Sequence, residues 1–288
     1  MQKTIVNRLC RNNLILPSLK STMNKILFAF LAVIFFSCNN NTADEKKFSN
    51  NTAMPEQEKN LRALMDQYPD SLLLKENLIQ YFRENGNYGQ AIAETGYALQ
   101  KDSMNARLWY IKATLLSENE DTLHAIKAWE KVVDLNPLPE NLLSMGSLYA
   151  LSKNPLALTM ANALLMAPKA NAQVQALFIK GLYYSTTGDK TQAIIFFDKC
   201  LSLNYNFLFA YREKAICLYD LGKYLDALKV LELSLAVKKE NDEAYYWMGR
   251  CFEKLSKKEE AIQNYQLALQ FDPNYIEAKD ALGKLGIK

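Results

Sequence analysis

Residues 242–275 read DEAYYWMGRCFEKLSKKEEAIQNYQLALQFDPNY. They form two segments with apolar residues at helical spacing, separated by a polar stretch and followed by Asp272-Pro273-Asn274. Proline lacks a backbone donor and disfavours helix in the residue before it. We therefore expect two helices joined by a short turn, with the second helix ending before Pro273.

The same arrangement recurs along the chain with a period of 34 residues. An alanine followed by an aliphatic residue marks the second helix at Ala91, Ala125, Ala193, Ala227 and Ala261. In the same phase, small residues of the first helix recur at Ala113, Gly181, Ala215 and Gly249. A fixed period of this length indicates a solenoid of supersecondary units. We count six units, at about 72–105, 106–139, 140–173, 174–207, 208–241 and 242–275.

This pattern resembles the tetratricopeptide repeat (TPR) family, which has an aromatic residue at position 4, small residues at 8, 20 and 27, and proline at 32. The unit at 242–275 matches it at Tyr245, Gly249, Ala261, Ala268 and Pro273. The unit at 106–139 matches it at Trp109, Ala113, Ala125 and Pro137. The resemblance implies an all-α fold, a right-handed α-solenoid of about six helix-turn-helix repeats with terminal capping helices.

The third unit departs from the pattern. Gly146 and Tyr149 fit a first helix displaced by one residue, and the turn around Asn154-Pro155 is short. We expect altered packing there, by a neutral deletion or by a local change of superhelix curvature. Residues 57–71 and 276–288 are expected to form an N-terminal and a C-terminal capping helix, since each repeat buries its apolar face only against neighbours.

The N-terminal 37 residues predict a leader, with Met23 as the true start. An apolar run from Ile26 to Phe36 is too short to cross a membrane and ends at Ser37-Cys38. This ending resembles a bacterial lipobox, which implies acylation of Cys38 after cleavage; the alternative is a plain secretory signal. Residues 38–56 then serve as a flexible tether. The resemblance implies a lipid-anchored protein of the bacterial cell envelope; the periplasmic face of the outer membrane is the expected place, and the inner membrane or another face is the alternative.

The charge of the chain changes when the leader is set aside. The five basic residues of 1–37, taken from 34, leave 29 against 31 acidic residues. A nucleic-acid binder needs a basic stripe, and none follows residue 37. The single histidine, His124, argues against a histidine metal site or a histidine-based hydrolase. We expect no catalytic residue, no metal and no cofactor.

The resemblance also places a ligand surface. In this family the first helices line a concave groove, and positions 2, 5, 9 and 12 share one helix face. The candidate residues for binding a partner are Arg107, Tyr110, Thr114, Phe178, Leu182, Phe209, Arg212, Ile216, Tyr219, Tyr246 and Arg250. Such a surface suits an apolar or amphipathic peptide or helix, with an arginine forking a carboxylate.

The predicted function is a membrane-anchored scaffold for protein–protein interaction, and not an enzyme. Alternatives are a cell-wall glycan binder, a structural spacer, or an assembly factor for outer-membrane or secretion complexes. Cys200, Cys217 and Cys251 are expected to be small buried residues, although a Cys200–Cys217 disulfide is an alternative.

Overall fold

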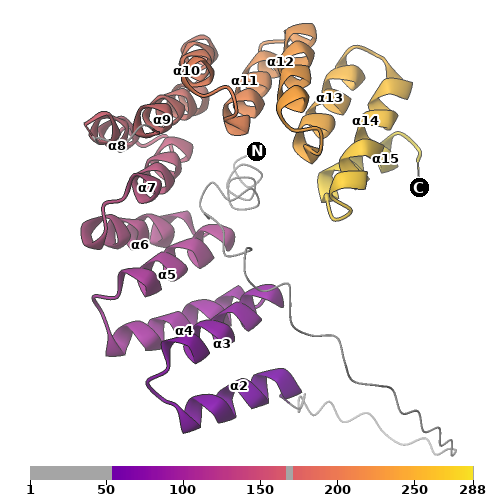
Figure 1. Ribbon diagram of the computed structural model, residues 1–288. Helices are drawn as coiled ribbons and strands as arrows, with labels where there is room; N and C mark the ends of the chain where they lie inside the picture. The colour runs from indigo at the N-terminus through magenta and orange to yellow at the C-terminus, as the bar shows by residue number, and fades with distance from the viewer. Residues whose placement is uncertain (1–53, 167–170, 288) are drawn as a thin grey trace, which may run out of the picture.

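The computed structural model describes residues 54–166 and 171–287. Within these residues the chain is entirely helical, with fourteen helices and no strand. Figure 1 shows the helices in chain order along an open arc, from α2 at one end to α15 at the other. The prediction of an all-α solenoid is confirmed.

Twelve helices make up the six repeat units, two per unit. The first helices are α3 (Leu72–Glu84), α5 (Ala106–Glu118), α7 (Pro139–Leu151), α9 (Ala172–Thr187), α11 (Leu208–Asp220) and α13 (Asp242–Lys254). The second helices are α4 (Tyr88–Lys101), α6 (Thr122–Leu135), α8 (Leu156–Leu165), α10 (Lys190–Leu203), α12 (Tyr224–Val237) and α14 (Lys258–Phe271). The remaining two are α2 (Glu56–Gln67) and α15 (Ile276–Lys284), which lie at the ends of the array.

Side-chain caps explain why several first helices begin where they do. The side chain of Ser71 accepts a hydrogen bond from the backbone N–H of Leu74, and Asn241 does the same for Ala244. Asn105 caps α5 in the same way, through two backbone N–H groups. These caps satisfy N–H groups that have no partner inside the helix.

The small residues are the positions at which helices meet. Each marker alanine, from Ala91 to Ala261, is fully buried. A Cβ atom added to Gly249 would lie 2.6 Å from a ring carbon of Tyr265, and one added to Gly181 would lie 2.4 Å from a ring carbon of Phe197. The aromatic side chain of the second helix therefore occupies the space left by the missing side chain of the first.

The third unit is irregular, as its sequence indicated. Helix α7 begins at Pro139, one residue before the 34-residue phase, and α8 has only 10 residues. The next helix, α9, has 16 residues and begins at Ala172. Eleven of the 13 residues of α7 are buried, so this unit forms the interior of the largest core cluster.

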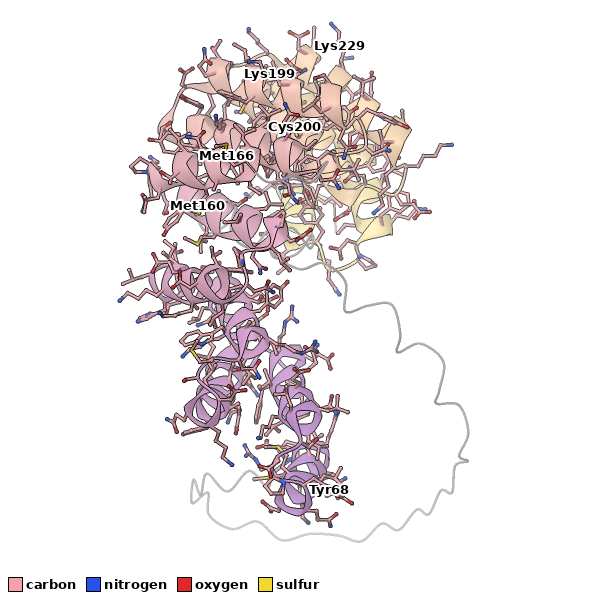
Figure 2. All side chains as sticks on the ribbon, turned by 60° about the vertical axis from the view of Figure 1, so that its left-hand side comes forward. Tyr68, Met160, Met166, Lys199, Cys200 and Lys229 are labelled. Carbon is pink, nitrogen blue, oxygen red and sulfur yellow. The ribbon has the colours of Figure 1, made fainter. Side chains whose placement is uncertain are left out.

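The outer helices carry exposed polar side chains over a buried inner side. Figure 2 labels two neighbours on α10, Lys199 and Cys200, together with Lys229 on α12. Both lysines are exposed, whereas Cys200 is fully buried. One residue of displacement on a helix turns the side chain by about 100°, which is enough to separate the outer face from the core.

Candidate functional site

The candidate site is the inner wall, by which we mean the faces of the first helices and α15 that carry positions 2, 5, 9 and 12. At the C-terminal end three consecutive helices of this wall, α11, α13 and α15, line one cavity of about 480 Å³. Its lining residues are Tyr219, Tyr246, Arg250, Glu253, Lys254, Glu277, Asp280, Ala281 and Lys284. The structure thus brings together three of the residues that the sequence indicated, one from α11 and two from α13.

Many inner-wall side chains contact the next unit. At three junctions the residue at position 5 contacts the residue at position 2 of the following unit, through an ion pair at two of them and through aromatic rings at the third. Arg107 donates to Glu76, with Nη2 2.7 Å from Oε2, and the rings of Phe178 and Phe209 lie 6.4 Å apart. These contacts join neighbouring first helices, so part of the candidate surface is used to hold the solenoid together.

At the N-terminal end the candidate residues differ in exposure. The Arg107 side chain is 57% exposed, so its ion pair with Glu76 is a surface pair. Tyr110 is half-buried and meets the ring of Trp129 edge-on at 5.4 Å. Burial is the main reason why the pKa of Tyr110 rises to about 12. Thr114 is buried, and its hydroxyl has no hydrogen-bond partner among the described residues.

In the middle of the solenoid the apolar candidates are mostly core residues. Phe178 and Leu182 are buried, and Phe178 packs against Phe197 and Phe207 as well as Phe209. Phe209 and Ile216 are half-buried. The sequence placed Phe178 and Leu182 on a ligand surface, but the structure places both inside the packing between units. The reason is that large apolar side chains fill the space between adjacent first helices.

Arg212 is also internal. Its guanidinium lies between two carboxylates, with Nη1 2.6 Å from Glu243 and Nε 2.9 Å from Glu213, and its side chain is only 5% exposed. The two carboxylates hold the pKa of Arg212 above its ordinary value against the opposing effect of burial. The fork expected for a ligand carboxylate is therefore occupied by the protein itself, and Arg212 joins α11 to α13.

Arg250 lies in a different setting, at the cavity. Its guanidinium carbon is 5.3 Å from the ring centre of Tyr219, 5.9 Å from that of Tyr246 and 5.5 Å from that of Trp247. Nη1 donates to the Tyr246 hydroxyl at 3.0 Å and Nη2 to the Tyr219 hydroxyl at 3.2 Å. Aromatic faces stabilise a guanidinium electrostatically.

The sequence analysis did not single out the part of the cavity formed by α15. It expected residues 276–288 to form a capping helix that begins a seventh first helix, and it named no inner-wall residue there. Counted in the repeat phase, Glu277, Asp280 and Lys284 occupy positions 2, 5 and 9 of a seventh first helix. That phase was the available signal, because a capping helix that continues the repeat also continues the inner wall.

The three cysteines of the repeats are free and buried. Burial raises the pKa of Cys200 to about 12, that of Cys217 to about 11 and that of Cys251 to about 12. The Sγ of Cys200 faces the carbonyl of Val174, whereas that of Cys217 faces the hydroxyl of Ser185. The alternative of a Cys200–Cys217 disulfide is therefore not realised in this structure.

Some predictions fall outside the described residues. These are the leader at 1–37, the start at Met23, acylation of Cys38 and most of the tether at 38–56. In the described ranges no helix is both long and apolar enough to cross a membrane. In the same ranges no three His, Cys, Asp or Glu side chains gather as a metal site.

Comparison with known proteins identifies the repeats. Two family models, both described as tetratricopeptide repeat, match residues 242–275 and residues 106–137 and 174–207. No curated protein matches the chain.

Solved structures share the fold. A tetratricopeptide repeat protein from Parabacteroides merdae is 22% identical with a TM-score of 0.66, over 79% of this chain and 90% of that one. PilW, described as a widely conserved type IV pilus biogenesis factor, is 18% identical with a TM-score of 0.53, over 73% of this chain and 97% of that one. A chain of the APC/C hetero-tetramer Cut9-Hcn1 is 18% identical with a TM-score of 0.52, over 80% of this chain and 46% of that one.

Proposed function

We propose, from the premise that this chain is a tetratricopeptide repeat protein, that it is a membrane-anchored scaffold which binds a peptide or helix of a partner protein along its inner wall. The repeat fold itself is a scaffold for protein–protein interaction. Recognition by the inner wall and anchoring at the bacterial cell envelope are the two parts that we add.

The observation that supports recognition is the cavity shared by α11, α13 and α15. Seven of its nine lining residues occupy inner-wall positions, and it combines aromatic faces with charged groups of both signs. Binding sites are typically concave, with apolar walls and a few placed polar groups. A folded helix or an extended segment could contact several units at once, because each unit repeats the same face.

The aromatic side chains favour a peptide over a glycan as the ligand. Tyr246 is buried, and both Tyr246 and Tyr219 are packed around Arg250. A sugar ring that stacks on an aromatic residue needs an exposed ring face. The groups that remain at the cavity surface are instead hydrogen-bond donors and charges, which suit a polypeptide.

The proposed anchor is Cys38, acylated after cleavage of the leader. Each buried CH₂ of an acyl chain contributes about 0.8 kcal/mol, so several chains hold a protein stably at a bilayer. The 17 residues between Cys38 and α2, 39–55, would reach about 21–25 Å if flexible, which places the solenoid beside the membrane.

Site-specific photocrosslinking in cells tests recognition. A photoreactive residue is placed at Gln80, an exposed inner-wall position on α3, or at Lys254, an exposed residue of α13 that lines the cavity. The matched control is Lys229, which is exposed on the outer helix α12. We expect one dominant protein adduct from the inner-wall positions and none from Lys229. Equal adducts from all three positions, or none from the inner wall, would contradict the proposal.

Metabolic labelling with a palmitate analogue tests the anchor. We expect label in the wild-type protein and in a Cys200→Ser control, and none in Cys38→Ser. The Cys38→Ser protein should also leave the membrane fraction after cell lysis. A labelled or membrane-bound Cys38→Ser protein would refute the proposed anchor. It would not affect the proposal that the inner wall binds a peptide.

A further inference from the structure

Helix α8, in the irregular third unit, differs from the other second helices in charge. Among the six second helices, all of which lie within the described residues, it alone contains no Asp, Glu, Lys or Arg. Each of the other five contains at least two such residues. Charged side chains are typical of a helix face that stays in water. The outer face of α8 is therefore suited to a different environment.

The apolar side chains of α8 are nevertheless exposed. Leu156 is 45% exposed and Leu165 is 44% exposed. Met166, which directly follows the helix, is 87% exposed, the largest value of any large apolar side chain in the described ranges. Figure 1 shows α8 on the outer side of the arc, at its bend. A surface of this kind, apolar and without charge, is typical of an interaction site.

The residues on this face follow a symmetric pattern of size. Leu156, Thr159, Ala163 and Met166 are separated by 3, 4 and 3 residues, so they share one side of the helix, and all four are exposed. The two end residues are large and the two middle residues are small. If a second α8 crosses the first in the antiparallel direction, Leu156 of each copy meets Met166 of the other. Thr159 likewise meets Ala163, and these small residues allow the helices to approach closely. Such reciprocal contacts are those of a twofold dimer.

A polar group beside this pattern favours a second copy over a lipid bilayer. The side chain of Asn162 is exposed, next to Ala163 in the middle of the helix. An amide carries both a donor and an acceptor, so the two Asn162 side chains can pair with each other across a twofold axis. In hydrocarbon the same amide would have no partner, which is costly. Since α8 has no charge, a second α8 also brings no like charge against it.

We propose that α8 binds α8 of a second copy of this chain, in the antiparallel direction and about a twofold axis. Two ten-residue helices, each about 15 Å long, offer less contact than the roughly 1,200–2,000 Å² of a stable interface. We therefore expect a weak dimer that forms at high protein concentration. Because α8 lies outside the arc, both inner walls stay open, and the dimer joins two of them. The inference does not depend on what the inner wall binds.

Sedimentation equilibrium of the full chain, purified in a density-matched detergent, tests for the dimer. The protein is measured at increasing concentrations up to the millimolar range. We expect its average mass to rise from that of one chain towards that of two and no further, since a twofold contact closes on itself. A mass that stays at one chain throughout, or that rises beyond two, would show that the inference is wrong.

Variants test the direction of the pairing. Thr159→Lys and Ala163→Glu each bring an unpaired charge into the contact, and each should lower the association constant at least about tenfold. The chain with both substitutions should recover most of this loss, because each new lysine then faces a new glutamate of the other copy. A parallel pair would place like charges together, so a double variant without recovery would refute the antiparallel contact.

Two measurements control for these variants. Leu225→Lys makes a similar change at an exposed apolar residue of α12, so it should associate as the wild type does. An equal loss of association in Leu225→Lys would show that α8 is not the contact. The substituted residues are all exposed, and urea unfolding should therefore give the wild-type midpoint for each variant.

Photocrosslinking in cells distinguishes a second copy from another occupant. A photoreactive residue at Thr159, in cells that express two differently tagged copies of the chain, should give an adduct that carries both tags. Lys229 on α12 is again the control and should give none. A different protein or a lipid in the adduct, or no adduct, would overturn the inference. The crosslinks from Gln80 and Lys254 report on the inner wall alone, so this inference and the proposed function can fail separately.

Discussion

In the turn between the two helices of a unit, the structure predicts which substitutions stabilise the folded protein and which destabilise it. Position 15, counted in the third unit from the displaced start at Pro139, has a positive φ in every unit, although only three of the six residues are glycine. The six residues are Gly86, Glu120, Lys153, Gly188, Gly222 and Ser256. Position 15 of the fifth and sixth units carries Gly222 at 74° and Ser256 at 59°. We predict that Ser256→Gly stabilises the protein and that Gly222→Ala destabilises it.

The magnitude follows from two opposing effects. An L residue with positive φ is destabilised by about 1–2 kcal/mol. Glycine at the same place loses about 0.5–1 kcal/mol more backbone entropy on folding. The difference is about 0.5–1 kcal/mol in favour of glycine. Side-chain crowding does not enter at Gly222, since no atom lies within 4 Å of an added Cβ.

Urea and thermal unfolding, followed by circular dichroism at the helix band, measure both variants. A change of 0.5–1 kcal/mol shifts the melting temperature by about 1–4 °C in a protein of this size. The control is Ser256→Ala, which keeps a Cβ at positive φ and should leave the midpoint nearly unchanged. A lower midpoint for Ser256→Gly, or a higher one for Gly222→Ala, would show that the turn is not strained in this way.

Three further predictions follow from the packing. Gly181→Ala should destabilise by about 1–3 kcal/mol in urea unfolding, because its Cβ would lie 2.4 Å from Phe197. Arg212→Ala should destabilise by about 3–5 kcal/mol in the same assay, since it leaves Glu243 buried without its partner. Cys217 should react slowly with a thiol reagent at pH 8 and faster as the pH rises, because burial raises its pKa to about 11 and the protonated thiol is unreactive.

Controls for these predictions come from the same chain. Gly283→Ala adds a Cβ with nothing within 4 Å and should not destabilise. Arg107→Ala removes a mostly exposed ion pair and should change stability by less than about 1 kcal/mol. In urea-unfolded protein, all of the thiols should react rapidly with the reagent. A native Cys217 that reacts as fast as in urea, or an Arg212 variant as stable as the Arg107 variant, would contradict the burial described above.

Much of the fold could be predicted because the helical spacing of apolar residues and the 34-residue period place the helices at the same residues. The period of 34 residues placed the first helices of four units at the residues where α3, α5, α11 and α13 begin. The third unit departs from the period. The sequence indicated the position of this departure but not the helix lengths and the burial that result from it. Whether α7 would bend, shorten or be buried depends on its neighbours, which the sequence of the unit does not contain.

The candidate site was less predictable than the fold. Position in the repeat predicts which face of a first helix a residue occupies, but not whether the next unit covers that face. Phe178 and Arg212 occupy the expected positions and yet are buried, one among rings and the other between carboxylates.

The sequence by itself determined the class of fold, the number of units and the small residues at which helices meet. These depend on contacts within one unit, where spacing along the chain sets spacing in space. The tertiary structure decided which inner-wall side chains are available. That depends on pairs about 31 residues apart, such as Tyr219 and Arg250. Of the two arginines at the C-terminal end of the wall, Arg212 is paired with two carboxylates, whereas the partners of Arg250 among the described residues are aromatic rings and hydroxyls. No local pattern distinguishes them, because the partner of each lies on another unit.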